Sequence, residues 1–263
     1  MHTLPPNLRC PYCHFSRFWK IRRGHKKCKR CRREWSSHLA LQDDFRMTVR
    51  EWRIFLKAFL WERRGARIST MTGFERRRVI RMAHFVRECM ASDIPSPFIG
   101  TVEIDETYIG GSQYNKRKGE RKSKRGHGTS KQAILGIYHR EGKQVKTVLL
   151  PNLKMANITT YIRSQVQDNS RVCTDTFMIY RNLSQWYRHE RVNHLKGEYV
   201  RGEIHTNSIE GFWGCLKRQL RSIGGIRRKR LGLYVAEETW RFNHHAFPIE
   251  KQVEILLNLV AEK

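Results

Sequence analysis

Two Cys-x-x-Cys pairs constrain the beginning of this chain more tightly than any other feature of the sequence. Cys10 and Cys13 form the first pair, and Cys28 and Cys31 form the second. Each pair places two thiolates on one tight turn, and two such turns complete the tetrahedral sulfur site that Zn²⁺ prefers. So short a segment cannot build a stable core alone, so the metal would supply its folding energy. We therefore expect a zinc ribbon over residues 1–40 with a structural Zn²⁺; iron is the alternative metal.

Aromatic and basic residues surround these cysteines. Trp19 and Trp35 are available for the small core of the ribbon, and the Lys and Arg residues around the second pair would contact DNA phosphates. The remaining cysteines are scattered, and each is most simply a small buried apolar residue: Cys89, Cys173 and Cys215. Four paired cysteines out of an odd total of seven favour metal binding in a reducing compartment over a disulfide framework.

The charge of the chain predicts a polyanionic partner. There are 52 Lys and Arg residues against 24 Asp and Glu residues, which gives a formal net charge of +28. No apolar run approaches the ~18 residues that a transmembrane helix needs, and residues 1–8 contain no apolar signal-peptide core. Double-stranded DNA is therefore the expected partner, and a membrane is not.

Two capping boxes predict helices between residues 41 and 97. Thr48 with Glu51 opens the first helix, and Thr72 with Glu75 opens the second. The second helix carries apolar residues on one side and five arginines on the other: Arg76, Arg77, Arg78, Arg81 and Arg87. This segment is either a helix-turn-helix DNA reader or a helical linker with a solvated basic face. The prolines within residues 92–97 break the helix and mark a domain boundary.

The second half of the chain alternates between strands and helices. We expect strands at residues 101–108, 133–138, 145–150 and 171–174, helices at 155–166, 180–187 and 231–242, and an extended piece at 194–200. The Gly-rich basic stretch 116–131 is too polar to pack, so it predicts an exposed hairpin loop that contacts the DNA backbone. Its candidate phosphate contacts are Lys116, Arg117, Lys118, Arg121, Lys122, Lys124 and Arg125.

A further helix, beginning near residue 205, presents two stripes. Its apolar face contains Ile209, Phe212, Trp213, Leu216 and Leu220. Its neighbouring polar face contains Asn207, Glu210, Gly214, Lys217 and Arg221. A carboxylate on a rigid helix with a cation two turns away suits a metal ion and a phosphate. Alternatively, Asn207 and Glu210 form a capping box.

Three carboxylates occupy characteristic places in this order of strands and helices. Asp105 lies within the first strand, Asp175 ends the fourth strand, and Glu210 lies on the late helix. A carboxylate within an apolar strand is costly unless it is paired or bound to metal; Asp175 also suits a turn. Glu103 would share the strand face of Asp105, and Glu106 would lie on the opposite face. This order is typical of an α/β, mixed-sheet, RNase H-like nucleotidyltransferase core, placed here over residues 98–263 with the C-terminal helix.

Several motifs together carry a resemblance to a known family. They are the two cysteine pairs, residues 104–111, Thr174-Asp175 with Tyr180, residues 205–213 with Lys217-Arg218, and residues 240–243. Across most of its length the chain resembles the DDE transposases of bacterial insertion sequences, in the ISXO-like group that carries an N-terminal zinc ribbon and is related to eukaryotic Merlin transposases. The resemblance implies that Asp105, Asp175 and Glu210 are the catalytic triad, followed by the basic Lys217. Some relatives use Asn at the third position, so Asn207 is an alternative ligand.

This resemblance also implies a reaction and its partners. The triad would hold two Mg²⁺ or Mn²⁺ ions, with Asp105 bridging both, and Lys217, Arg218 and Arg221 would contact phosphates. The protein would bind terminal inverted repeats, cleave at the element ends and join the 3′-hydroxyl ends to target DNA, as a homo-oligomer in the nucleoid of a bacterial cytoplasm. The alternatives are a repurposed or inactive zinc-ribbon DNA-binding protein and a zinc-ribbon nuclease, neither of which transfers strands.

Overall fold

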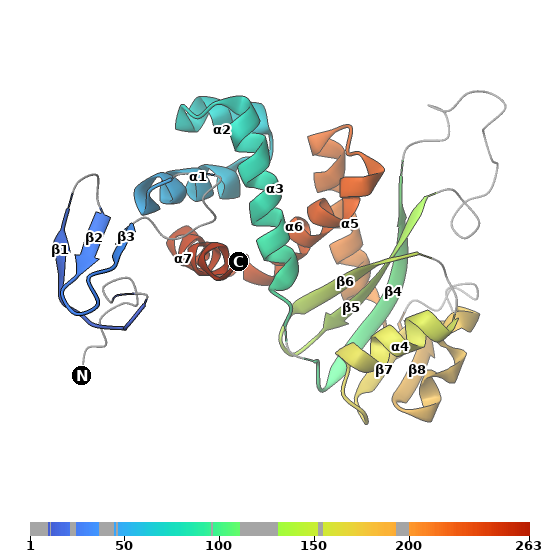
Figure 1. Cartoon of the computed structure of the whole chain (residues 1–263). Helices are drawn as coiled ribbons and strands as arrows, with labels where there is room; N and C mark the ends of the chain where they lie inside the picture. The colour runs from blue at the N-terminus through green and yellow to red at the C-terminus, as the bar shows by residue number, and fades with distance from the viewer. Residues whose placement is uncertain are drawn as a thin grey trace. The chain divides into compact units, whose positions relative to one another are not determined.

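The protein folds as two compact units, seen in a computed structural model (Figure 1). The structure describes residues 10, 12–21, 25–36, 45, 47–95, 97–110, 131–151, 155–192 and 200–263. The first unit takes in residues 1–89 together with 247–263, and the second takes in residues 90–246. The basic loop from Lys116 to Arg125 and most of the extended piece predicted at 194–200 lie outside the described residues.

The first unit begins with a small antiparallel sheet, as the ribbon prediction requires. Its strands are β1 (Phe18–Lys20), β2 (His25–Cys28) and β3 (Glu34–Ser36), in the order β1-β2-β3. The prediction that Trp19 fills the ribbon core is wrong, because its side chain is 39% exposed. Lys29 and Arg32 lie over its ring instead, 5.5 and 5.0 Å from the ring centroid. Cations thus cover part of the Trp19 indole. The side chain of Trp35 is not among those that the structure describes.

Among its described residues, the rest of the first unit contains four helices. They are α1 (Val49–Trp61), α2 (Gly65–Thr72), α3 (Arg76–Ser92, whose last residues belong to the second unit) and α7 (Ile249–Glu262). The predicted capping box at α1 is confirmed: the Thr48 N–H donates to Glu51 Oε2 over 2.7 Å, and the Glu51 N–H donates to Thr48 Oγ1 over 3.2 Å. Helix α7 packs along α1, where Lys57 pairs with Glu250 over 3.0 Å.

The second predicted capping box is wrong. Thr72 ends α2, and its hydroxyl bonds back to the Ile68 carbonyl over 2.7 Å. Gly73 then takes the left-handed conformation, with φ of 73°, which reverses the chain within three residues. Glu75 opens α3, because its carboxylate accepts from the Arg77 and Arg78 backbone N–H groups over 2.8 and 2.9 Å. A carboxylate at this position also interacts favourably with the positive end of the helix dipole.

Not all of the α3 arginines form the predicted basic face. Arg76, Arg77 and Arg81 are exposed. Arg87 is 3% exposed, and its guanidinium lies 5.4 Å from the Phe59 ring centroid, so it belongs to the packed side of the helix.

The second unit is built on a mixed five-stranded sheet in the order β6-β5-β4-β7-β8. The strands are β4 (Thr101–Ile109), β5 (Gln132–His139), β6 (Gln144–Leu150), β7 (Arg171–Asp175) and β8 (Arg188–Val192). β4, β5 and β6 pair antiparallel, whereas β7 pairs parallel with both β4 and β8. The first four strands confirm the predicted ones. β8 was not predicted, because residues 188–192 are mostly polar and lack apolar alternation.

Helices cover both faces of this sheet. They are α4 (Met155–Gln165), η5 (Met178–Gln185), α5 (Asn207–Ile223), the short 3₁₀ turn η7 (Arg228–Arg230) and α6 (Leu231–His244). The helix predicted over residues 180–187 corresponds to η5, which is a 3₁₀ helix. One apolar core joins the sheet to α4 and η5, and a second joins its other face to α5 and α6. Successive residues of β4 alternate between these cores, so the face that carries Asp105 is the one that α5 covers. Among the residues that the structure describes, no helix combines the length and the apolar character needed to cross a membrane.

Candidate active site and metal centre

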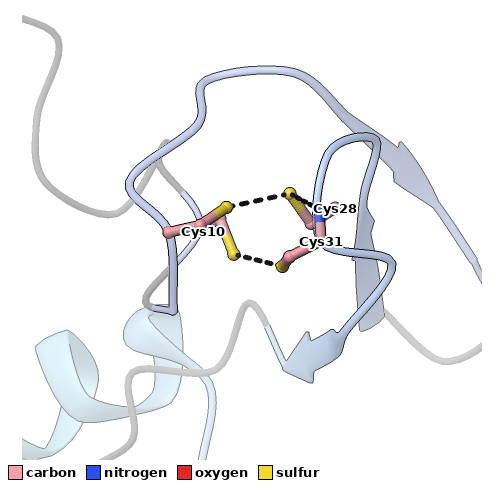
Figure 2. Close-up of side chains that lie close together, drawn as sticks. Cys10, Cys28 and Cys31 are labelled. Atoms are coloured by element: carbon pink, nitrogen blue, oxygen red, sulfur yellow. Dashed lines mark hydrogen bonds between the residues drawn. The ribbon is translucent and has the colours of Figure 1, made fainter.

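The four cysteines of the ribbon converge on one point. Their sulfur atoms all lie within 4.8 Å of one another, with 3.5 Å between Cys10 and Cys31 and 3.5 Å between Cys13 and Cys28. Figure 2 shows the labelled cysteines turned toward each other from the two loops. Burial alone raises the pKa of the Cys28 thiol, but hydrogen bonds from the Cys31 and Arg30 backbone N–H groups outweigh it and lower that pKa to about 6. In the same cluster, a hydrogen bond from the Arg33 backbone N–H is outweighed by burial and by hydrogen bonds with the other cysteines, which raise the pKa of the Cys31 thiol to about 12. Binding of a metal ion by these cysteines would therefore release protons.

Asp105 and Asp175 lie at the same level on neighbouring strands. The register pairs Glu103 of β4 with Cys173 of β7, an offset of 173 − 103 = 70 residues, and Asp175 follows Asp105 by the same 70. Both side chains fall on the face that α5 covers, by the alternation of the strands. Burial, reinforced by the charges of Glu106 and Asp175, raises the pKa of Asp105 to about 8. The charges of the two carboxylates therefore repel each other across the neighbouring strands.

Helix α5 brings the third carboxylate to this face. Its buried residues are the predicted stripe, Ile209, Phe212, Trp213, Leu216 and Leu220. Glu210 lies on the exposed side of its first turn, and its charge contributes to the raised pKa of Asp105. The predicted capping box of Asn207 with Glu210 is wrong, because the N-cap is Thr206, whose hydroxyl donates to Glu210 Oε1 over 3.0 Å. Asn207 is exposed as the first helical residue.

Trp213 makes a contact that sequence reasoning missed. Its core role is confirmed, but its indole N–H also donates to Asp105 Oδ2 over 3.0 Å. Gly136 lies opposite Asp105 in β5, and a Cβ at that position would come within 2.5 Å of the Trp213 ring. The signal was present in the sequence: a glycine inside a strand often marks a close approach by another group.

The carboxylates beside Asp105 have partners of their own. Glu106 lies on the opposite face, as predicted, and accepts a hydrogen bond of 2.5 Å from the Tyr180 hydroxyl. Burial raises the pKa of Glu106 to about 7. Glu103 shares the face of Asp105, as predicted, and is fully buried against Arg140 and the start of α5. Asp105 is thus the carboxylate of this strand that lies on the same face as Asp175 and accepts a hydrogen bond from the Trp213 indole N–H.

The basic residues of α5 continue its polar side. Lys217 is half-buried, and burial lowers its pKa while the charge of Asp105 acts in the opposite sense. Arg218 and Arg221 are exposed. A cation near Asp105 with arginines beyond it is suited to a phosphate.

The acidic groups fit divalent cations, although they are more widely spread than the cysteines. Within the described ranges, only the four cysteines bring three or more such ligand atoms within 4.8 Å of one another. Carboxylate oxygens are the ligands that Mg²⁺ prefers, and Asp105 is a buried carboxylate close enough to Asp175 and Glu210 for their charges to help raise its pKa. Two ions, each held by a pair of these carboxylates, would suit this wider spacing.

Comparison with known proteins identifies the family. A family model described as "ISXO2-like transposase domain" matches residues 97–243. The chain belongs to this transposase family. The match confirms the resemblance drawn from the sequence motifs, and it covers Asp105, Asp175, Glu210 and Lys217.

Two curated relatives of this transposase family member have names that refer to transposases or transposable elements. An "Uncharacterized transposase-like protein" of Haemophilus influenzae is 36% identical over 118 residues, which cover 44% of this chain and 94% of that protein. An "Uncharacterized protein in transposable element ISH50" of Halobacterium salinarum is 28% identical over 166 residues, covering 59% of this chain and 55% of that protein.

A viral intasome is among the solved structures that match. It is a cryoEM structure of the simian T-cell lymphotropic virus intasome in complex with PP2A regulatory subunit B56 gamma, with 14% identity and a TM-score of 0.35 over 69% of this chain and 65% of that chain. A TM-score this low does not establish a shared fold.

Proposed function

We propose that this member of the ISXO2-like transposase family binds the terminal inverted repeats of its element, cleaves phosphodiester bonds at the element ends and transfers the 3′-hydroxyl ends to target DNA. The observation that carries the proposal is the placement of Asp105 and Asp175 at the same level of adjacent strands, on the face covered by the helix that bears Glu210. The strand order and mixed pairing of the sheet support an RNase H-like core.

In this proposal the three carboxylates hold two Mg²⁺ or Mn²⁺ ions. Bound there, the ions would supply activation of the attacking oxygen and stabilisation of the leaving oxygen. Water first attacks the phosphorus at the element end and releases a 3′-hydroxyl. That hydroxyl then attacks a phosphodiester of the target, where a new P–O bond forms to the element end and the P–O3′ bond of the target breaks, releasing the target's 3′-hydroxyl. Lys217 holds a phosphate beside Asp105, the exposed Arg218 and Arg221 contact the backbone, and Trp213 orients the Asp105 carboxylate through its indole N–H.

DNA recognition is assigned to the first unit. We place a structural Zn²⁺ on the four cysteines, in a ribbon where cations lie over exposed aromatic rings. Helices α2 and α3, joined by the short turn at Gly73, serve as a helix-turn-helix reader whose exposed arginines face DNA. We further propose three domains, at residues 1–40, 41–97 and 98–263. The protein would act as a homo-oligomer on two element ends, at the bacterial nucleoid.

A cleavage assay tests the proposal. DNA carrying the sequence that flanks the gene is incubated with the protein and Mg²⁺ or Mn²⁺, beside Asp175→Asn, Glu210→Gln and Asn207→Ala variants. Asp168→Asn is the matched control, because Asp168 is exposed and precedes the start of β7, whereas Asp175 lies at the end of that strand. We expect metal-dependent nicking at a repeat end and joined products with wild type, Asp168→Asn and Asn207→Ala, and neither with Asp175→Asn or Glu210→Gln.

The other outcomes separate the alternatives. Loss of cleavage in Asn207→Ala with retention in Glu210→Gln would make Asn207 the third ligand. Retarded DNA without cleavage by any variant would make the protein a repurposed DNA-binding protein. Hydrolysis without joined products would make it a nuclease.

A further inference from the structure

A buried carboxylate caps α5 from outside the helix. Glu103 Oε2 accepts hydrogen bonds from the backbone N–H groups of Ser208 and Ile209 over 2.9 and 3.0 Å. The first N–H groups of a helix have no acceptor within the helix itself. The N-cap residue Thr206 makes no side-chain hydrogen bond to them, because its hydroxyl donates to Glu210. Glu103, which is fully buried, therefore supplies the missing acceptor from strand β4.

Arg140 holds that carboxylate and the chain that leads into the helix. Its Nε donates to Glu103 Oε1 over 2.7 Å, its Nη1 donates to the Glu203 carbonyl over 2.6 Å, and its Nη2 donates to the His205 carbonyl over 2.8 Å. The His205 Nδ1 atom lies 3.2 Å from Glu103 Oε1 and 3.1 Å from Arg140 Nη2. One guanidinium thus ties the strand, the entering segment and the helix together, and such charge-assisted bonds have defined geometry.

A second contact lies further along the same strand and the same helix. Trp213 of α5 donates to Asp105, two residues beyond Glu103. Two residues of a strand span about 6.6 Å, and the four to five residues from the Glu103 contact to Trp213 span about 6–7.5 Å of helix. The spacings match, so α5 runs along β4 and is held at two points, with Glu210 between them.

We propose that Glu103 and Arg140 are positioning residues that hold the first turn of α5 so that Glu210 faces the Asp105–Asp175 pair. The inference rests on the proposed function, because it gives a buried ion pair a role in DNA cleavage. Without the Glu103 contact, the first backbone N–H groups of α5 lose their acceptor on β4, and the helix start can shift relative to that strand. Misplacement of a reacting group by about 1 Å costs on the order of 10²-fold in rate.

A second buried ion pair provides the control. Glu237 is also fully buried, and Arg241 Nε donates to its Oε1 over 2.9 Å within α6. Glu237→Gln therefore removes one charge from a pair of similar burial without touching the bonds at the start of α5. A purely stabilising role for Glu103 predicts that the two substitutions behave alike.

The experiment compares the zinc-loaded, full-length wild type with Glu103→Gln and Glu237→Gln by two measurements. The first is amide hydrogen exchange over residues 207–213, without divalent cation or DNA. We expect Glu103→Gln to lower protection of the first turn about tenfold or more, as loss of a hydrogen bond to a charged group implies, and Glu237→Gln to leave it unchanged. The second is cleavage, where we expect Glu103→Gln to lower kcat about 10²-fold with unchanged DNA affinity, and Glu237→Gln to match wild type.

Arg140→Lys guards against a Glu103 variant that does not fold. Lysine can pair with Glu103 but cannot also reach both carbonyls, so we expect reduced protection of the first turn and reduced kcat, each smaller than in Glu103→Gln. Wild-type exchange in both Glu103→Gln and Arg140→Lys overturns the inference, as does an equal loss of kcat in Glu103→Gln and Glu237→Gln. A wild type that never cleaves DNA, with the exchange difference present, overturns the proposed function and leaves the role of Glu103 in holding α5 intact.

Discussion

The lack of a side chain at Gly136 lets Trp213 approach the sheet. We expect Gly136→Ala to destabilise the second unit by about 1–3 kcal/mol, because the added Cβ would lie 2.5 Å from the indole ring. The displaced indole would also lose its hydrogen bond to Asp105, so metal-dependent cleavage should fall. Gly232→Ala in α6 is the control, since its Cβ would meet Leu149 only at 3.6 Å. Thermal unfolding of Gly136→Ala, alone and combined with Trp213→Leu, measures the loss of stability. Equal losses of stability in Gly136→Ala and Gly232→Ala would contradict a clash with the indole ring.

Because of Lys146, the free energy of unfolding should change with pH in the alkaline range. Lys146 is 3% exposed, its amine donates to Gln165 Oε1 over 2.9 Å, and burial lowers its pKa to about 8. Between that value and the ordinary lysine pKa of about 10.4, the unfolded chain binds the proton that the folded protein has lost. The free energy of unfolding should therefore rise with pH across this window. We expect Lys146→Met to abolish that rise and the exposed Lys143→Met to keep it, as measured by urea unfolding at pH 7.5, 9 and 10.5.

At the scale of the element, hydrophobic periodicity predicted which face of a helix or strand is buried. The apolar stripe of α5 and the alternation of β4 follow from side chains that repeat every 3.6 or 2 residues, and both are confirmed. The bonds that join elements were not predicted, because partners such as Glu103 and Ile209 are 106 residues apart. Thr72 shows a related limit: a Thr-x-x-Glu pattern looks the same whether the Thr opens one helix or ends another.

The ribbon should depend on its metal more than any other element. Its strands span only three or four residues each, so we expect chelation or Cys13→Ser to unfold residues 10–36 while the second unit stays folded. Metal analysis should find about one Zn²⁺ per chain in wild type, and limited proteolysis should then cut the ribbon first. Cys215→Ser is the control, because Cys215 lies on α5 in the other unit. A ribbon that resists protease after chelation would count against a structural metal.

The exposed arginines of α3 allow a test of whether this helix binds DNA. Arg81 is exposed, so Arg81→Gln should weaken binding and make the slope of log K against log salt less negative by about 0.9 per lost phosphate contact. Arg50→Gln is the control, since Arg50 is an exposed arginine near the start of α1. Fluorescence anisotropy at several salt concentrations checks this. Identical slopes for the two variants would remove α3 from the proposed DNA interface.

At the scale of the whole molecule, a chain with a net charge of +28 divides into two compact units. The family match covers residues 97–243, which lie within the second unit, and the cysteine cluster lies in the first. The C-terminal helix α7 follows the second unit in sequence yet packs with α1 in the first. Sequence order alone cannot reveal this, because an amphipathic helix shows which face it buries and not which partner covers it.

This arrangement predicts where a defect in α7 will be felt. Leu256 is fully buried on α7, so Leu256→Ala should cost about 2–5 kcal/mol in the first unit and leave the second unchanged. Ile162→Ala, in the α4 core of the second unit, should do the reverse. Hydrogen exchange across a urea series assigns each loss: amides of α1 should lose protection in Leu256→Ala, and amides of β4 and β5 in Ile162→Ala. Loss of protection in both units from either substitution would mean that the two units unfold together, and α7 would then stabilise the whole chain.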